Sequence, residues 1–342
     1  MHQPGRVSVT NLYILVTGGA GFIGSHACKE LAAQGYVPVA YDNLSTGHAD
    51  AVRWGPLVTG DILDTQRLEA VVRHFKPVAV MHFAACASVA ESVSDPAKYY
   101  LNNIVGTSTL LRVCERQGVN NLIFSSSCAT YGAPAVLPIR ESTVQQPINP
   151  YGGSKLVGEM LLADCAASCD LRYVALRYFN ACGADLDGDL GERHTPETHL
   201  IPRVLLAASG GAATFELFGD DYETPDGTCI RDYIHVCDLV AAHILALRHL
   251  LDGGESLALN VGTGSGLSVR EIVDAVSRIT GYDVPTEIRP RRPGDPPALY
   301  ADPFLIQQKL GFRAKYSDVD TIVRTAAPFF GIELPPRFRV AV

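Results

Sequence analysis

The chain has 342 residues, of which 47% are hydrophobic and 19% charged, and its formal net charge at pH 7 is −8. This length is enough for two lobes, because domains cluster near about 100 to 150 residues. The acidic balance argues against a nucleic-acid partner, since phosphate backbones attract basic surfaces. It leaves room for a small anionic ligand, which needs only a few local arginines and helix N-termini.

The distribution of apolar residues argues against a membrane protein, because no run of about 18 uncharged apolar residues is present to cross a bilayer. The polar stretch 1–11 lacks the charged-then-apolar layout of a secretory signal, so we expect the chain in the cytoplasm. The nine cysteines are odd in number and include no Cys-x-x-Cys pair. We therefore interpret them as reduced core residues rather than as a disulfide framework or a zinc ribbon.

Short apolar runs alternate with longer amphipathic stretches as far as residue 180. This alternation predicts an α/β fold with a doubly wound parallel sheet of the Rossmann type, covered by helices on both faces. The predicted strands are residues 12–17, 37–41, 57–58, 78–83, 122–126 and 173–177.

The pattern changes after Asn180. Long loops in a compact enzyme commonly carry binding residues. We therefore expect an NAD-binding Rossmann domain at 1–180 that also receives 232–262, and a smaller C-terminal α/β domain at 181–342 that mainly binds substrate. The Gly/Asp/Pro-rich loops lie at 184–191, 220–227 and 289–297, and the helical patterns at 236–251 and 269–280.

A glycine-rich turn follows the first predicted strand and reads Gly-Gly-Ala-Gly-Phe-Ile-Gly from Gly18, with a helix expected to begin near Ser25. Glycines permit a tight turn and the close approach of a pyrophosphate to a helix N-terminus. Asp42 ends the next strand, where a carboxylate can accept hydrogen bonds from ribose hydroxyls and would repel a 2′-phosphate. The pattern favours NAD over NADP, and a turn-capping role for Asp42 is the alternative.

Tyr151 and Lys155 lie four residues apart after Pro150, so they share one face of a predicted helix. A tyrosine with an ordinary pKa of about 10 is a poor base, but a nearby ammonium and a cationic nicotinamide both favour the phenolate. Lowering that pKa by about three units needs roughly 4 kcal/mol. A solvated helix pair is the alternative. The pair gains weight from segment 124–132, which begins as a buried strand and ends where open α/β sheets bind ligands.

These motifs make the chain resemble an extended short-chain dehydrogenase/reductase of the branch that epimerises nucleotide sugars, over residues 12–312. The markers are Thr-Gly-Gly-Ala-Gly-Phe-Ile-Gly-Ser-His from Thr17, Asp-Asn-Leu-Ser-Thr-Gly from Asp42, Gly-Asp-Ile from Gly60, His-Phe-Ala-Ala from His82, Asn-Asn-Ile from Asn102, Ser-Ser-Ser from Ser125, Tyr-Gly-Gly-Ser-Lys from Tyr151, Arg-Tyr-Phe-Asn from Arg177, Asp-Gly-Thr-Cys-Ile-Arg-Asp-Tyr-Ile-His-Val from Asp226 and Arg-Pro-Gly-Asp from Arg292.

The resemblance implies an NAD-dependent isomerase of galactose metabolism that interconverts UDP-glucose and UDP-galactose through a 4-keto sugar. It also implies a homodimer of paired helices, including the helix that carries Tyr151. The alternative is a related 4-epimerase acting on UDP-N-acetylglucosamine or a UDP-pentose. A 4,6-dehydratase or decarboxylase is disfavoured because Cys-Ala-Thr, without an acidic residue, follows Ser127. An idle NAD-sensing module is disfavoured because Ser127, Tyr151 and Lys155 occur together.

Roles follow from the resemblance for the matching residues. Tyr151 would be the base, Lys155 would tune it and hold the nicotinamide ribose, and Ser127 would hydrogen-bond the 4′-hydroxyl of the sugar. Besides Tyr151 and Lys155, the residues expected to bind NAD are Gly18, Gly21, Phe22, Ile23, Gly24, Asp42, Asn43, Asp61, Ile62, Phe83, Ala84, Asn103, Ser125 and Tyr178. Besides Ser127 and Tyr151, those expected to bind the UDP-sugar are Asn180, His199, Leu200, Phe218, Arg231, Arg292, Asp295 and Leu299.

Within the substrate set, the resemblance assigns the diphosphate to Asn180, Arg231 and Arg292, the uridine ribose to Asp295 and the uracil to Phe218. Each assignment has an alternative reading that the sequence leaves open. The arginines could be surface charges, Phe218 could be core packing, and the hydroxyl of Ser127 could cap a strand end. Asp61 and Ile62 would flank the adenine.

Two residues depart from the pattern of the family, since Ala87 stands where well-known members carry lysine and His199 where many carry asparagine. The matching residue of Leu299 helps to set the size of the hexose pocket in the family, and leucine is intermediate in volume. His194 and His199 together suggest a metal pair. Because no His-Glu-x-x-His layout or carboxylate partner is recognisable, the sequence predicts no metal site.

Overall fold

The structure is a computed structural model that describes residues 12–292 and 295–334. The predicted polar tail 1–11 lies outside the described residues, as do parts of the predicted loop 289–297 and of the predicted second domain.

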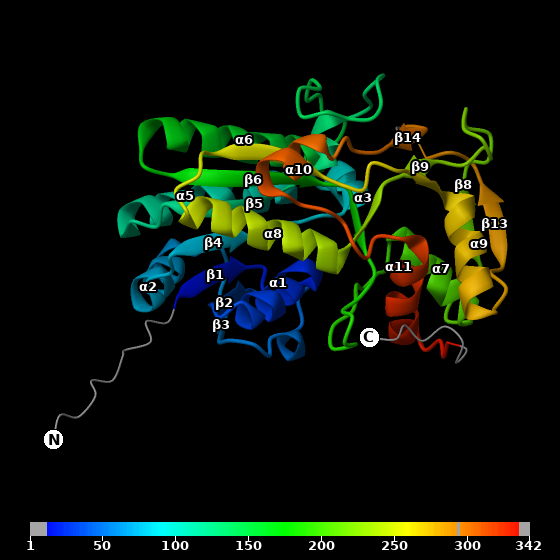
Figure 1. Ribbon diagram of the computed structural model, residues 1–342, viewed down its shortest axis with the longest axis horizontal. Helices are drawn as coiled ribbons and strands as arrows, with labels where there is room; N and C mark the ends of the chain where they lie inside the picture. The colour runs from blue at the N-terminus through cyan, green and yellow to red at the C-terminus, as the bar shows by residue number, and fades with distance from the viewer. Residues whose placement is uncertain (1–11, 293–294, 335–342) are drawn as a thin grey trace.

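A seven-stranded sheet forms the centre of the larger lobe (Figure 1), in the order β11-β6-β5-β4-β1-β2-β3. All its neighbouring strands run parallel. This confirms the predicted fold class and all six predicted strands. The strands are β1 (Tyr13–Thr17), β2 (Val37–Asp42), β3 (Leu57–Thr59), β4 (Ala79–His82), β5 (Asn121–Ser127), β6 (Arg172–Tyr178) and β11 (Leu257–Val261).

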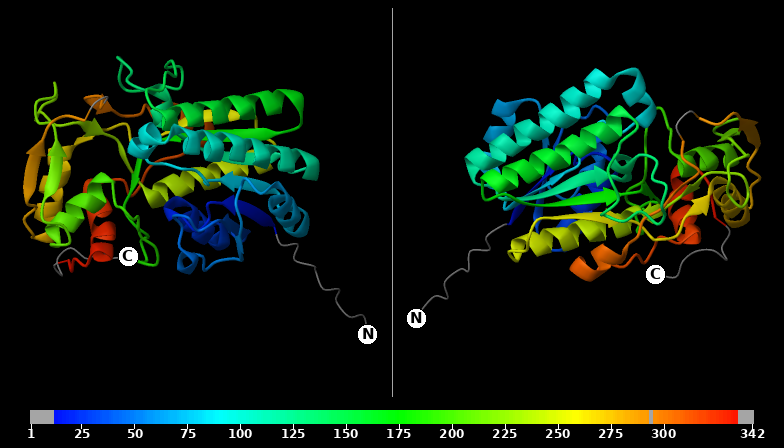
Figure 2. Two further views of the ribbon diagram at one scale, coloured as in Figure 1. Left: turned by 180° about the vertical axis from the view of Figure 1, so that it is seen from behind. Right: turned by 90° about the horizontal axis from the view of Figure 1, so that it is seen from above.

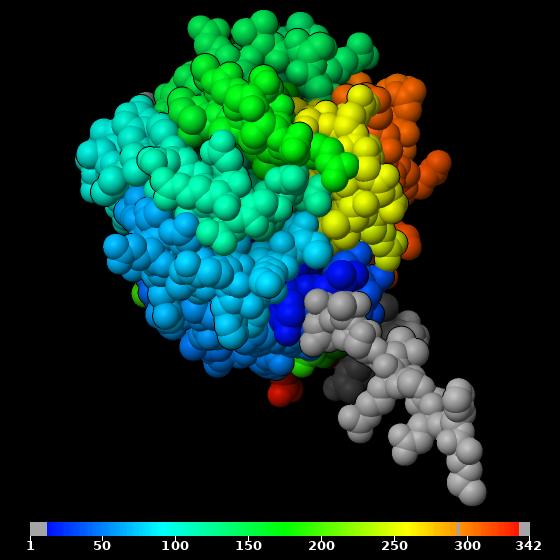
Figure 3. Space-filling view, turned by 90° about the vertical axis from the view of Figure 1, so that its left-hand side faces the viewer, coloured from blue at the N-terminus to red at the C-terminus, as the bar shows by residue number. Residues whose placement is uncertain are grey.

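The strand β11 comes from the second half of the chain and completes one edge of this sheet. It pairs with β6 so that Leu257 lies opposite Val174 and Val261 opposite Tyr178. In the space-filling view, the yellow segment from the second half of the chain lies beside the green segment from the first half (Figure 3). The division of the chain into domains at residue 180 stays a prediction.

Helices cover both faces of the sheet because successive side chains of a strand point to opposite faces. Ile14 and Val16 of β1 belong to one core cluster, and Leu15 to the other. The first cluster includes side chains of α1 (Phe22–Ala33) and α8 (Val236–Leu251). The second includes α2 (Thr65–Phe75), α5 (Gly106–Gln117) and α6 (Pro150–Ser168), which lie together on the other side (Figure 2).

The helix α1 begins at Phe22, three residues before the predicted start at Ser25. Gly21 is its N-cap in an extended conformation, without a side-chain cap. A Cβ at Gly24 would lie only 2.1 Å from the carbonyl oxygen of Gly18, so the helix can pack this tightly on the turn only with glycine there. The predicted start of the helix lay too far along the chain because residues of the glycine motif itself form the first turn of α1.

The smaller lobe is built around a separate core cluster made by α7, α9 and α11 with β8. Its sheets are small, with orders β10-β7, β12-β9-β14 and β13-β8. The predicted helices at 236–251 and 269–280 are confirmed as α8 and α9, whereas the short strands were not predicted. The elements are β7 (Asn180–Cys182), α7 (Leu200–Ala208), β8 (Phe215–Phe218), β9 (Ile230–Arg231), β10 (Tyr233–His235), β12 (Leu267–Ser268), α9 (Val269–Thr280), β13 (Thr286–Arg289), β14 (Ala298–Leu299), α10 (Phe304–Leu310) and α11 (Val319–Ala326).

Short helices complete the chain between these elements. Among the described helices, none is long and apolar enough to cross a membrane. The short helices are α3 (Val89–Ser94), α4 (Pro96–Tyr99), the π-helix η2 (Tyr100–Val105) and the 3₁₀ helices η1 (Ala49–Ala51), η3 (Cys128–Tyr131) and η4 (Ala327–Phe330).

A buried ion pair joins α6 to β6 beneath the end of β5. Nη2 of Arg177 lies 2.6 Å from Oε2 of Glu159, and both side chains are 8% exposed. Ser126 donates a hydrogen bond to Glu159, and Nη1 of Arg177 donates to the hydroxyl of Tyr131 at 2.8 Å. Four elements, β5, η3, α6 and β6, therefore meet in one hydrogen-bonded network.

We predict that Glu159→Gln lowers the free energy of unfolding by about 3 kcal/mol, because it leaves the guanidinium of Arg177 buried without a countercharge. Glu255→Gln is the matched control. Its carboxylate pairs with Lys309 at 2.9 Å on the surface, where solvent screens the pair, and we expect little change. Urea unfolding of the two variants and the wild type measures the difference. Equal midpoints for both variants would contradict the importance of the buried pair.

Candidate active site

The glycine-rich turn lies between the end of β1 and the N-terminus of α1. Gly18 has φ of +73°, and a Cβ there would lie 2.6 Å from the backbone nitrogen of Ala84. Only glycine tolerates both constraints without strain. The first N–H groups of a helix have no intrahelical acceptor. Because Gly21 caps α1 without a side chain, Phe22, Ile23 and Gly24 present the open N-terminus that an anionic group needs.

The acidic residues predicted beside this turn lie at the ends of β2 and β3. Oδ2 of Asp42 accepts a hydrogen bond from the backbone N–H of Ala20 at 2.9 Å, and its Oδ1 accepts one from Leu44 at 2.8 Å. Asn43 donates to Oδ2 of Asp61 at 2.9 Å. Asp42 therefore does cap turns, as the alternative reading held, and this capping holds its carboxylate at the carboxyl end of β2.

Other residues predicted to bind the cofactor line the next strand end. Phe83 directly follows β4, and its ring centroid lies 4.8 Å from that of His243. Ile62 is buried and packs against Gly106. A Cβ on residue 106 would lie 2.4 Å from Cδ1 of Ile62. Asn103 is 3% exposed, and its side-chain amide donates to the carbonyl of Cys86 and to the hydroxyl of Ser154. In the structure Asn103 thus braces the loop after β4 against α6.

The three residues predicted to be catalytic come together where β5 ends and α6 begins. Nζ of Lys155 donates to the backbone carbonyl of Ser125 at 2.7 Å and lies 5.9 Å from the ring centroid of Tyr151. The hydroxyl of Ser125 is hydrogen-bonded to that of Tyr178. The hydroxyl of Ser127 accepts from the N–H of Ala129 at 3.1 Å, which caps η3 as the alternative reading held.

Burial dominates the electrostatics of this group. It raises the pKa of Tyr151 well above its ordinary value, and a hydrogen bond with Ser127 only partly offsets this increase. Burial also lowers the pKa of Lys155 to about 8. The predicted phenolate therefore needs more positive charge than Lys155 supplies, and a cationic ring beside Tyr151 would provide it.

Two pairs of predicted substrate residues meet in the smaller lobe. The guanidinium carbon of Arg292 lies 3.9 Å from the ring centroid of Phe218, a cation–π contact. Nη2 of Arg231 lies 3.2 Å from Oδ1 of Asp295. The two arginines can therefore bring positive charge next to an aromatic face and an acidic hydrogen-bond acceptor.

A strand pair and a small core cluster connect this group to the end of β5, where the predicted catalytic residues lie. Leu299 on β14 pairs with Arg231 on β9. Leu299 and Cys128, the residue after Ser127, pack against the same small core cluster. Asn180 donates to the carbonyl of Asp232 at 2.8 Å, so its side-chain nitrogen is engaged within the protein. Leu200 is the first residue of α7 and packs on the third core cluster.

His199 is the N-cap residue of α7, and its ring faces acidic residues. Its Nδ1 lies 2.7 Å from Oε1 of Glu192 and 2.9 Å from Oε1 of Glu197. His194 lies beside it, with 4.8 Å between the ring centroids. The structure thus supplies carboxylate partners that were not recognised in the sequence, because the spacing of these residues matches no familiar motif.

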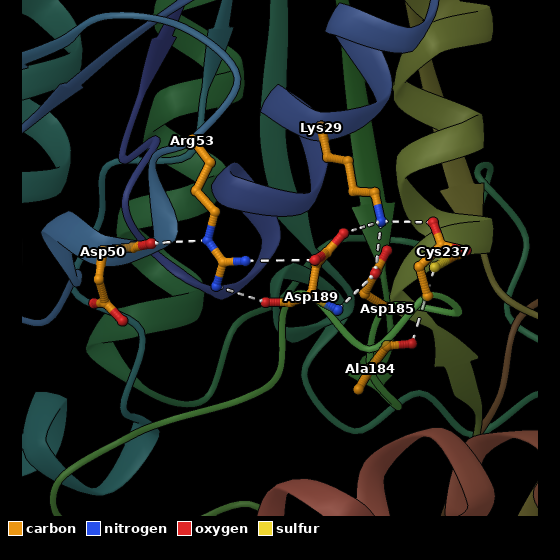
Figure 4. Close-up of polar contacts among 8 residues, drawn as sticks. Lys29, Asp50, Arg53, Ala184, Asp185, Asp189 and Cys237 are labelled. Atoms are coloured by element: carbon orange, nitrogen blue, oxygen red, sulfur yellow. Dashed lines mark hydrogen bonds and ion pairs between the residues drawn. The ribbon is translucent and has the colours of Figure 1, made fainter.

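The loop between β7 and α7, residues 183–199, is held against α1 by Lys29. Its Nζ lies 2.7 Å from Asp185, 2.7 Å from Asp187 and 2.9 Å from Asp189 (Figure 4). A cavity of about 150 Å³ lies between this loop and the glycine-rich turn. Its lining includes Gly21 on one side and Arg193 on the other, and it does not include Tyr151.

Asp232 is a structural residue of the site that was not singled out from the sequence. It is fully buried and accepts hydrogen bonds from the backbone N–H groups of Thr263, Gly264 and Ala301. These bonds fix β9 and the segment after β14 against the end of β11. The sequence did contain a signal for Asp232, because it stands between Arg231 and Tyr233 in a run that resembles a strand. A carboxylate in a buried strand needs hydrogen-bonding partners, which indicates a structural role.

Comparisons with known proteins agree with this geometry. The sequence pattern of the NAD dependent epimerase/dehydratase family matches residues 14–262. A UDP-glucose 4-epimerase of Rhizobium meliloti is 51% identical over 316 residues, which are 92% of this chain and 96% of that protein.

Solved structures are similar over almost the whole chain. The crystal structure of UDP-glucose 4-epimerase from Brucella ovis in complex with NAD is 63% identical, with a TM-score of 0.93 over 95% of this chain and 100% of that one. The UDP-Glc/GlcNAc 4-epimerase from Campylobacter jejuni is 40% identical, with a TM-score of 0.83 over 94% of this chain and 99% of that one.

Proposed function

Because the chain belongs to the NAD dependent epimerase/dehydratase family, we propose that it interconverts UDP-glucose and UDP-galactose through a 4-keto sugar, with NAD as its cofactor. The observation that carries this proposal is the meeting of Ser127, Tyr151 and Lys155 at the end of β5, at the same edge of the sheet as the glycine-rich turn. The names of relatives about 50% identical over 92% of the chain support the same reaction.

The residues present fit NAD. The open N-terminus of α1 suits the pyrophosphate, and the carboxylate of Asp42 at the end of β2 suits the adenosine ribose. Bound NAD supplies reversible acceptance of the hydrogen on C4 of the sugar. We assign the nicotinamide end to the neighbourhood of Phe83, Tyr178 and Lys155, where a cationic ring would offset the burial of the Tyr151 hydroxyl.

Tyr151 acts in this proposal as the base that takes the proton of the 4′-hydroxyl and later returns it. Ser127 orients that hydroxyl, since its own oxygen is fixed by the N–H of Ala129. Lys155 keeps a positive charge near the ring at neutral pH, because its pKa of about 8 remains above 7. All three groups stay in place while the ketone turns to present its other face.

The UDP portion is assigned to the smaller lobe. Arg231 and Arg292 would bind the diphosphate, Phe218 the uracil and Asp295 the uridine ribose. Asn180 and His199 keep their assignment as predictions, although the structure engages Nδ2 of Asn180 and Nδ1 of His199 within the protein. The hexose must be held more loosely than UDP, because a tight hexose site would prevent the turn of the ketone.

We further propose a homodimer that pairs the helical face of α6 with the segment α3–η2. Exposed apolar side chains gather on these elements, including Val93, Tyr100, Leu101 and Met160, with exposures of 66%, 46%, 54% and 56%. A second copy of the chain would bury them. Sedimentation of the pure protein at micromolar concentration tests this, and a monomer would contradict it. Because the proposed substrates are nucleotide sugars, we also propose that the protein acts in the cytoplasm, in galactose metabolism.

The reaction class is tested by incubating the purified protein with UDP-galactose, without added cofactor, and following the anomeric NMR signals. We expect UDP-glucose to form, because the redox cycle is closed and needs no second substrate. Tyr151→Phe should lower turnover by at least about 10², while NAD is still released when the pure variant is denatured. A nearly fully active Tyr151→Phe enzyme would contradict the mechanism, and release of NADP would contradict the role of Asp42.

A second candidate substrate class follows from Leu299, which we assign to a wall of the hexose pocket; its pairing with Arg231 and its packing near Cys128 support this assignment. Leucine leaves more room than tyrosine, so we expect weaker but measurable turnover of UDP-N-acetylglucosamine. Leu299→Tyr should reduce kcat/KM for the acetamido sugar by at least about 10-fold relative to the plain sugar. If the ratio of the two kcat/KM values is unchanged, Leu299 does not select the substrate.

A further inference from the structure

Four side chains with metal-ligating atoms converge in the loop that precedes α7. They occupy the pattern Glu192-x-His194-x-x-Glu197-x-His199, and one ligand atom of each lies within 4.8 Å of the others. The glutamates are largely buried, with side-chain exposures of 4% and 9%, whereas His194 and His199 remain 31% and 50% exposed. The cluster is thus closed on its carboxylate side and can be reached from solvent past the imidazoles.

The distances from the imidazole nitrogens to the carboxylate oxygens of this group range from 2.7 to 3.8 Å, on either side of the separation in a tetrahedral ligand set. Oε1 of Glu192 lies 3.1 Å from Nδ1 of His194 and 2.7 Å from Nδ1 of His199. Glu197 lies 2.9 Å from Nδ1 of His199 through Oε1 and 3.8 Å from Nδ1 of His194 through Oε2. Nitrogen and oxygen ligands at about 2.0 to 2.1 Å from zinc are separated by about 3.3 Å when the geometry is tetrahedral.

We propose that Glu192, His194, Glu197 and His199 bind one zinc ion as a structural site. Two imidazoles and two carboxylates suit zinc, and the two carboxylate charges balance its charge. Both histidines direct the same nitrogen, Nδ1, toward the carboxylates. All four ligands are supplied by the protein, which is the closed arrangement of structural rather than catalytic zinc.

The ion would fix the end of a loop whose beginning is fixed by other means. Lys29 holds Asp185 and Asp189 against α1, and Arg193 forms two bonds to Asp50, at 2.9 and 3.0 Å. The zinc site would tie the last part of this loop to the N-cap of α7. The first helix of the smaller lobe would then be held in register with the larger lobe.

The competing description is a set of ion pairs in which both imidazoles are protonated and no metal is bound. Protons and zinc would occupy the same Nδ1 atoms, so the two descriptions exclude each other at any moment. Zinc binding must therefore release protons, and the zinc affinity must fall as the pH falls.

The test uses the full chain after dialysis against a chelator, titrated with zinc chloride in a calorimeter. We expect about one zinc per chain, a higher Tm in zinc, and proton release that changes the apparent binding heat with the buffer. Cobalt(II) in place of zinc should give the intense visible absorption of a tetrahedral site. Absence of stoichiometric zinc binding, or a weak cobalt spectrum of octahedral type, would overturn the proposal.

Matched variants separate this site from adventitious binding. Each of His194→Gln and His199→Gln removes a nitrogen ligand, so each should weaken zinc binding by more than the about 10- to 100-fold cost of losing an outer-shell partner and abolish the zinc-dependent rise in Tm. His249→Gln, a histidine whose ring is bound to the carbonyl of Glu255, and Asp187→Asn, in the acidic group around Lys29, should leave zinc binding unchanged. Circular dichroism of each variant checks that it is folded. Equal zinc affinity in all four variants would contradict the assignment.

Discussion

The buried contact between Glu159 and Arg177 is the constraint on which the end of the sheet with the proposed catalytic residues depends. Two charges that are 8% exposed are costly to remove from water, and they are tolerated only because each oxygen and N–H group has a specific partner. Two of the groups in this network lie on elements with residues of the proposed site, because Glu159 is on α6 with Tyr151 and Ser126 is on β5 with Ser127. The helix with Tyr151 and the strand that ends at Ser127 are thereby fixed with respect to each other by directional bonds rather than by apolar packing alone.

Asp232 has the corresponding role where the smaller lobe meets the sheet. Its carboxylate gathers backbone N–H groups from the segments after β11 and β14, and the next residue in the chain toward the N-terminus is Arg231. The hydrogen bonds of the buried Asp232 therefore fix the backbone next to Arg231, the arginine that faces Asp295. In both lobes, a buried polar network fixes the backbone next to a residue that we assign to the site.

The sequence was most informative where apolar runs are long and alternate with helices. The strands at 12–17 and 122–126 were recognised because buried parallel strands read as continuous apolar runs. The strand β9 consists of Ile230–Arg231 alone, and a pair of residues carries no period that could be detected. The carboxylates near His199 were missed for another reason. Their convergence comes from the path of an irregular loop, which no local propensity encodes.

The pairing of β11 with β6 has a consequence for how the protein is made on the ribosome. Until Leu257–Val261 has been synthesised, β6 presents an unpaired edge, and one face of the sheet lacks the helix Val236–Leu251. An open parallel edge invites pairing with other chains. The nascent Rossmann sheet must therefore wait for the first part of the smaller lobe, from β7 to β10, to emerge, and neither lobe can be exchanged with that of a relative by a single cut in the gene.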